Sequence, residues 1–210
     1  NNEDGIWKFL ADVSAGLSYL HSIDPQIIHQ DIKPANILID ANGNYCITDF
    51  GISIKSGAED ERNLDNESSG TTIYMPPERF KDGYIPETSS DIWSLGATVY
   101  ELLTGDVPFG NKGGAAQLNG ERIPTIKKKI SKKITKIIYA CLDADPKKRP
   151  SAEYIAEYAR NKGKNDNYFF VTSILLIVGL SIMGLFIWHS NPKPLNPFLI
   201  YKNKGDSILN

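Results

Sequence analysis

Cysteine is scarce in this sequence, with two residues among 210. Cys46 lies in the apolar run YCIT and Cys141 in IIYACL, so both are expected to be buried thiols rather than a disulfide or a metal-binding pair. An excess of charge is lacking too, because 23 basic and 25 acidic side chains leave a formal net charge of −2. No nucleic acid is therefore expected as a partner. What remains is a globular domain of a reducing, cytosolic compartment.

A secretory signal peptide is also absent, so residues 1–165 are not expected to be exported. Residues 168–188, in contrast, hold 21 consecutive uncharged side chains, with aromatic residues at both ends. A helix of this length crosses a bilayer core of about 30 Å. The alternative, a buried core helix, is usually shorter and keeps a polar stripe. We predict one transmembrane helix at 168–188 and a short extracytoplasmic tail at 189–210.

Basic residues do not orient this span, because equal numbers flank it. They are Arg160, Lys162 and Lys164 before it, and Lys193, Lys202 and Lys204 after it. The span contains no convincing motif of small residues for helix pairing, so a homodimer stays possible without being required.

Residues 5–22 are predicted to form a helix, because apolar side chains recur there at steps of three and four. They are Ile6, Leu10, Val13, Leu17 and Leu20. Short strands are expected in QIIHQD, NILID and YCITDF, with ANGN as the hairpin turn between the last two.

The second half of the soluble part is predicted to be helical. SSDIWSLGATVYELLTG, at 89–105, starts with a serine cap, is apolar on almost every face and ends in glycine, which indicates a helix in the middle of the domain. Further helices are expected in SKKITKIIYACL and SAEYIAEYAR, whereas residues 52–72 are polar and rich in Gly and Ser, as in a loop.

Two carboxylates and one amide suggest the chemistry of the chain. Asp31 can accept a proton from a hydroxyl group, and Lys33 can neutralise charge on a phosphoryl group in transfer. Asn36 and Asp49 supply the hard oxygen ligands that suit Mg²⁺. The alternative for each residue alone is a turn or capping role, so the ordered set carries the argument.

Five motifs in order resemble the C-terminal lobe of the eukaryotic-like serine/threonine protein kinase family, over about residues 5–160. They are HQDIKPAN at 29–36, DFG at 49–51, GTTIYMPPE at 70–78, DIWSLGATVYELLTGDVPF at 91–109 and DPKKRP at 145–150. The resemblance implies a mainly α fold at residues 1–163, a kinase C-terminal lobe with short β-hairpins, followed by the transmembrane helix.

The resemblance also implies roles for individual residues and cofactors. Asp31 and Lys33 are the expected catalytic residues, Asn36 and Asp49 the metal ligands, and Leu38 part of the floor under the adenine of ATP. Structural roles are implied for His29, Phe50, Gly51, Glu78, Asp91 and Arg149, with Glu78 paired to Arg149. ATP and Mg²⁺ are the implied cofactors, and serine or threonine side chains of proteins the implied substrates.

Two positions bear on regulation. Thr71 is interpreted first as an active-site hydrogen-bonding residue and second as a phosphorylation site. Gln30 stands where the family has an arginine, and a neutral amide cannot clamp a phosphate as that cation does. Loop phosphorylation is expected to be a weaker switch here. His21 and His189 have no metal-ligand partners in the sequence and are assigned no role.

The motifs and the span together look most like bacterial membrane-anchored kinases, which implies a single-pass protein of the plasma membrane with a cytoplasmic kinase lobe. Neither a G-x-G-x-x-G loop nor the strand lysine of the ATP-covering lobe precedes the motifs, so the chain is expected to be a fragment that is inactive alone. The alternative is a non-catalytic kinase-like scaffold or binding module at the membrane. KKKISKK, at 127–133, fits a solvated helix face or a membrane contact.

Overall fold

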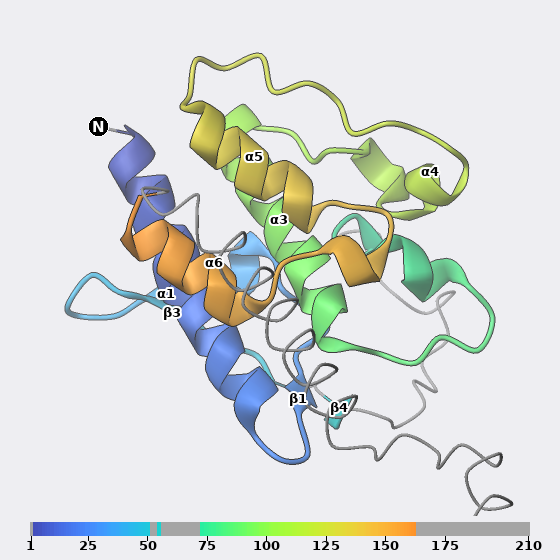
Figure 1. Cartoon of the computed structure of the whole chain (residues 1–210), viewed down its shortest axis with the longest axis horizontal. Coiled ribbons are helices and arrows are strands. Elements are labelled where there is room, and N and C mark those ends of the chain that lie inside the picture. The colour runs from blue at the N-terminus through green and yellow to red at the C-terminus, as the bar shows by residue number, and fades with distance from the viewer. Residues whose placement is uncertain (1, 51–53, 56–71, 163–210) are drawn as a thin grey trace, which may run out of the picture. The chain divides into compact units, whose positions relative to one another are not determined.

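The computed structural model describes residues 2–50, 54–55 and 72–162, which belong to the first of two units of the chain, Asn1–Lys164 and Asn165–Asn210 (Figure 1). Its longer helices are α1 (Asn2–Ser22), α3 (Thr88–Thr104), α5 (Lys132–Cys141) and α6 (Ala152–Arg160). The shorter elements are β1 (Ile27–Ile28), η1 (Pro34–Asn36), β2 (Ile37–Ile39), β3 (Tyr45–Ile47), β4 (Ile54–Lys55), η3 (Pro77–Phe80), η4 (Gly110–Lys112), α4 (Ala115–Leu118) and η5 (Pro146–Lys148). The mainly helical prediction is confirmed for this part of the chain.

Helix α3 forms the centre of the lobe, with α1 and α5 packed against it (Figure 1). Side chains on nearly all of its faces are buried, among them Trp93 and Leu95, which have no exposed surface. The helix ends at Gly105, whose φ of 89° lies in the left-handed region that glycine adopts without strain. Helix α6 packs along α1 on the outer side.

The predicted serine cap of α3 is wrong, whereas serines do start the two later helices. The residue before α3 is Glu87, whose side chain makes no capping bond, and Ser90 lies inside the helix. Ser131 Oγ accepts a hydrogen bond from Ile134 N, and Ser151 Oγ accepts one from Tyr154 N. Because α3 begins at Thr88, Ser89 and Ser90 both lie within the helix, and neither can cap its start.

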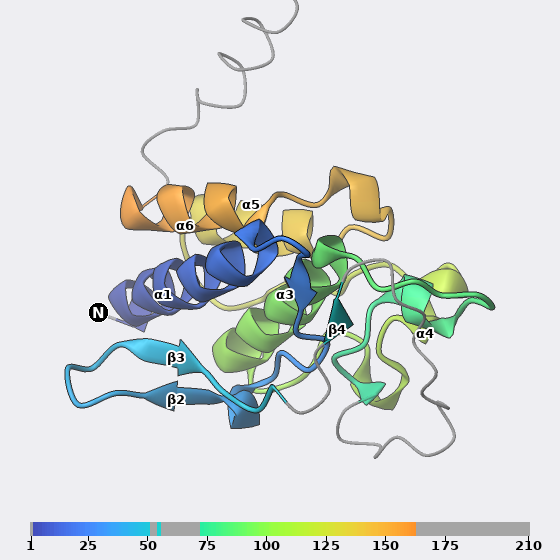
Figure 2. The ribbon, with the colours of Figure 1, turned by 90° about the horizontal axis from the view of Figure 1, so that it is seen from below.

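Two small antiparallel sheets flank the helices (Figure 2). Strand β1 pairs with β4, and β2 pairs with β3 in a hairpin whose register sets Leu38 opposite Cys46. The hairpin turn forms where ANGN predicts it, because Asp40 Oδ1 accepts hydrogen bonds from the backbone N–H groups of Asn42 and Asn44, each 2.8 Å long. These bonds lower the pKa of the Asp40 carboxyl.

The two cysteines have different surroundings. Cys141 is buried between α5 and α3, and burial raises the pKa of its thiol to about 12. Cys46 is exposed, so the prediction of a second buried thiol is wrong. The apolar neighbours of Cys46 in the sequence do not indicate burial here, because Cys46 lies in a two-stranded hairpin opposite Leu38, which is exposed too.

Within residues 2–50, 54–55 and 72–162, none of the helices has the length and apolar character needed to cross a bilayer. The predicted span at 168–188 and the tail at 189–210 lie outside the described residues and stay predictions.

Candidate active site

The loop that carries Asp31 is anchored on the central helix through Asp91. This buried carboxylate, in the first turn of α3, accepts hydrogen bonds from the backbone N–H of His29 (2.9 Å) and of Gln30 (2.7 Å). Gln30 has a φ of 66°, so the backbone is in the left-handed region where the two N–H groups meet Asp91. Asp91 also accepts a bond from His21 Nε2 at 2.9 Å. Asp91 thus holds the backbone of the loop that carries Asp31, and these hydrogen bonds are the geometry of its predicted structural role.

His29 links this loop to the end of strand β3. Its ring nitrogen Nε2 donates to the carbonyl of Thr48 at 3.0 Å, and its Nδ1 accepts the N–H of Asp31 at 3.3 Å. The ring of Phe50 lies edge-on to it, with centroids 5.2 Å apart. The buried imidazole therefore positions the backbone of Asp31 and orients the segment that leads to Asp49.

Asp31, Lys33 and Asn36 form one polar cluster. Asp31 Oδ2 accepts a hydrogen bond from Asn36 Nδ2 and pairs with Lys33 Nζ, both at 2.8 Å. Asn36 Nδ2 also donates to the Asp31 backbone carbonyl at 2.8 Å. The other carboxylate oxygen, Oδ1 of Asp31, is buried and has no hydrogen-bond partner among the described residues. A buried acceptor of this kind is costly unless a donor from outside the chain reaches it.

Asn36 and Asp49 are brought near each other by Thr48. The backbone N–H of Thr48 donates to the carbonyl of Asn36 at 2.9 Å, and its hydroxyl donates to the same carbonyl at 3.2 Å. Asp49 follows directly, exposed and with a φ of 62°, an uncommon backbone conformation for a residue other than glycine.

The chemistry of these two side chains suits Mg²⁺. The Nδ2 group of Asn36 is occupied by Asp31, which leaves its oxygen Oδ1 for a metal. One amide oxygen and one carboxylate fit Mg²⁺, which completes its coordination with water and phosphate. The structure shows no group of three or more His, Cys, Asp or Glu side chains that could hold a metal elsewhere in the part it describes.

Apolar side chains are exposed next to the cluster. The exposed fraction is 56% for Leu38, 64% for Ile39 and 50% for Phe50. A separate hollow of about 290 Å³ lies between α1, the β2–β3 hairpin and α3, and Ile39 lines it while Leu38 and Phe50 do not. Its apolar lining includes Phe9, Ile39 and Leu102. Leu38 is therefore free to contact a flat apolar ligand, as predicted for the adenine ring.

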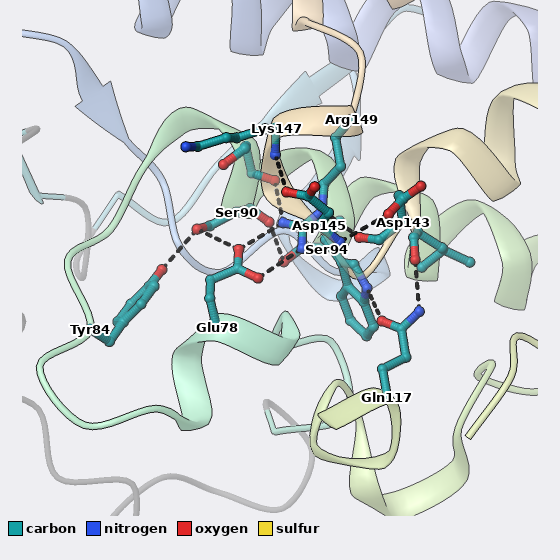
Figure 3. Close-up of polar contacts among 12 residues, drawn as sticks. Glu78, Tyr84, Ser90, Ser94, Gln117, Asp143, Asp145, Lys147 and Arg149 are labelled. Atoms are coloured by element: carbon teal, nitrogen blue, oxygen red, sulfur yellow. Dashed lines mark hydrogen bonds and ion pairs between the residues drawn. The ribbon is translucent and has the colours of Figure 1, made fainter. Parts of the chain in front are cut away.

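Glu78 and Arg149 form the predicted ion pair, and it is bidentate (Figure 3). Both distances between the guanidinium nitrogens and the carboxylate oxygens are 2.7 Å, and Arg149 also donates to the carbonyls of Asp143 and Ser89. Ser90 Oγ donates to Glu78 and accepts from the hydroxyl of the half-buried Tyr84, whose pKa is raised by loss of contact with water. The network ties η3 to α3 and to η5.

The structure brings the predicted residues together with partners that the sequence did not identify. The sequence indicates no role for His21, yet its ring binds Asp91, because the last turn of α1 packs against the first turn of α3. Thr48 and Tyr84 were likewise missed, and neither lies in a motif that could have signalled it. Gly51 and Thr71 lie outside the described residues, so their predicted roles stay predictions.

Comparison with known families gives a match to the protein kinase domain over residues 2–159. Mitogen-activated protein kinase kinase 3 of Arabidopsis thaliana is 39% identical over 169 residues, which are 76% of this chain and 32% of that protein. Dual specificity protein kinase zak2 of Dictyostelium discoideum is 36% identical over 177 residues, 79% of this chain and 26% of that protein.

A yeast protein gives a similar result. MAP kinase kinase skh1/pek1 of Schizosaccharomyces pombe is 36% identical over 163 residues, 72% of this chain and 43% of that protein. The chain thus covers less than half the length of each of these relatives. The expected resemblance to bacterial membrane-anchored kinases stays a prediction.

Proposed function

Since this chain belongs to the protein kinase family, we propose that it is the lower, catalytic lobe of a protein serine/threonine kinase that uses ATP and Mg²⁺. The observation that carries the proposal is the buried Oδ1 of Asp31, an acceptor without a partner among the described residues, beside Lys33 and Asn36. A substrate hydroxyl is the donor that would complete it. The activity of the whole protein is part of this proposal, because the chain covers only a fraction of its relatives.

Each residue of the cluster has a separate task. Asp31 accepts the hydrogen bond of the substrate hydroxyl and then its proton, with Asn36 and Lys33 fixing the other carboxylate oxygen. Lys33 keeps its charge close to the acceptor, where it offsets negative charge on the transferring phosphoryl group. Asn36 and Asp49 would hold Mg²⁺, which neutralises charge on the phosphates when bound.

Serine and threonine are the proposed substrate hydroxyls. The support is the motif D-x-K-P-x-N at 31–36, in which Lys33 occupies the position that resembles serine/threonine kinases. In the structure Lys33 pairs with Asp31, so its positive charge lies next to the proposed proton acceptor.

The proposed enzyme includes an upper half that covers ATP. Leu38 and Phe50, close in sequence to the catalytic residues, expose more apolar surface than a covered face would, as is typical of side chains that another part of a protein covers. We also propose that residues 168–188 anchor the enzyme in a membrane with the lobe in the cytoplasm, because 21 uncharged residues are long enough to span it.

Replacing Asp31 by Asn in the full product of the gene tests the function. The amide keeps the shape and can still accept the Asn36 bond, but it cannot take up a proton. We expect kcat for phosphorylation of a serine- and threonine-containing protein to fall by about 10²–10⁴. The dissociation constant for ATP should be almost unchanged, because neither oxygen of Asp31 is assigned to the metal.

Asp106→Asn is the matched control, since it makes the same chemical change on an exposed carboxylate distant in sequence from the cluster. It should leave kcat unchanged. If the wild-type product binds partner proteins but transfers no phosphate under any condition, the scaffold alternative replaces the enzyme. Equal kcat for wild type and Asp31→Asn would rule out the role of Asp31.

A further inference from the structure

One long segment of the lobe carries positive charge only. Residues 122–142 contain seven basic side chains and no acidic one, in a chain whose formal net charge is −2. The segment includes the start of α5, where Lys132 and Lys133 occupy the first turn. The N-terminal end of a helix is the positive end of its dipole, so lysines there oppose the helix rather than support it. The position of these lysines favours a role in contact with a negatively charged partner.

Two contacts place this segment at the end of the lobe where α6 finishes. The carboxylate of Glu3, in the first turn of α1, accepts the N–H of Ser131 at 2.9 Å. The next residue, Asp4, pairs with Lys162 just after α6 at 2.6 Å. The first turn of α1 therefore joins the start of α5 to the end of α6, and Figure 1 shows these three ends at one side of the lobe.

We define the basic face as residues 127–133 and 157–162 together with the first turn of α1, residues 2–5. These segments carry seven basic and three acidic side chains, the acids being Glu3, Asp4 and Glu157. Lys127, Lys129 and Lys132 are exposed. Lys128 already donates to the carbonyl of Leu103 at 3.0 Å, so it serves packing within the lobe.

We propose that the basic face lies against anionic lipid headgroups. The proposal rests on the membrane span proposed above. After Arg160 the chain has seven residues, 161–167, before the uncharged run begins, and these reach at most about 25 Å when extended. A lobe tethered so closely meets the bilayer surface at a high effective concentration. Each lysine near an anionic surface should then favour the docked state about fivefold.

Förster resonance energy transfer from a donor dye on the lobe to acceptor dyes on lipid headgroups tests this docking in the full chain. A donor dye is placed on Thr125→Cys, an exposed position two residues before the lysines, in a Cys46→Ser background. Cys141 is fully buried and remains unlabelled. The chain is reconstituted in lipid discs of phosphatidylcholine alone or of phosphatidylcholine with phosphatidylserine. We expect higher transfer with phosphatidylserine, and a loss of that increase at high salt.

The double variant K129Q/K132Q should weaken docking about 25-fold, as two lysines at fivefold each predict. Lys147 and Lys148 are exposed lysines in η5, at the start of α6 rather than at its end, so K147Q/K148Q is the matched control and should have no effect. Removing Lys132 should not unfold α5, because the lysine opposes the helix dipole.

Transfer that is the same in both lipids, or that both double variants lower equally, would overturn the proposal. So would tighter binding of the labelled chain, followed by its fluorescence anisotropy, to soluble RNA or an acidic polypeptide than to phosphatidylserine vesicles, since the face would then bind a soluble polyanion. Failure of the chain to insert into phosphatidylcholine discs would reject the proposed membrane span rather than the basic face. The same labelled chain mixed with preformed phosphatidylserine vesicles would still test the face through its dependence on Lys129 and Lys132.

Discussion

Arg149 shows how a single residue holds separate segments of the lobe together. Its guanidinium has no exposed surface and contacts groups from three segments, namely the carboxylate of Glu78 and the carbonyls of Ser89 and Asp143. Lysine would keep the charge but not the planar fork that reaches all of them. The residue therefore acts through geometry as much as through charge.

Arg149→Lys should lower the free energy of unfolding by about 2–4 kcal/mol, because buried acceptors lose their donor. Urea unfolding followed by brief proteolysis measures the change. Arg160→Lys, the same replacement at an exposed position, is the control and should alter stability by less than about 0.5 kcal/mol. If the two variants were equally stable, the network in Figure 3 would contribute little to the fold.

Among the elements, the contact between α3 and α5 decides how closely the lobe packs. A Cβ atom on Gly96, in α3, would lie 2.8 Å from Cys141 Cβ and 3.1 Å from Leu142 Cγ. The first of these atoms is fixed directly to the α5 backbone, so the two helices would have to separate. Glycine in the middle of a helix is unfavourable by itself, and here it permits the close approach.

Gly96→Ala should therefore destabilise the lobe by about 1–3 kcal/mol, the usual cost of overpacking, despite the better helix propensity of alanine. Gly5→Ala is the matched control in α1, since a Cβ there would meet nothing within 4 Å. It should stabilise the lobe by about 0.5–1 kcal/mol. The same urea and proteolysis experiment compares the two, and a stabilised Gly96→Ala variant would contradict the close approach.

For the whole molecule, the exposed surface beside the catalytic cluster sets what the chain can do alone. Each Å² of apolar surface that stays in water forgoes about 25 cal/mol of stabilisation, and Leu38, Ile39 and Phe50 are all at least half exposed. ATP would meet a floor at Leu38, while Asn36 and Asp49 reach the phosphates only through metal. In the proposed enzyme, residues 1–210 therefore supply the floor of the ATP site.

We predict that residues 1–210 alone show neither autophosphorylation nor saturable ATP binding at millimolar nucleotide. Isothermal calorimetry and a phosphate-transfer assay on a generic protein substrate measure both. The full product of the gene, assayed beside it, is the positive control. Robust phosphorylation by residues 1–210 would show that this chain needs no further half.

Local sequence patterns predict the longer helices, the hairpin and the residue types of the site. Periodic apolar side chains specify α1, α5 and α6, and the spacing of Asp31, Lys33 and Asn36 specifies the cluster, because both depend on residues close together in the chain. Three features become visible only in the folded chain: His21 binds Asp91, Cys46 is exposed, and Glu3 and Asp4 join the basic start of α5 to the end of α6. These features depend on residues distant in sequence, and local patterns do not encode which distant groups meet when the helices pack.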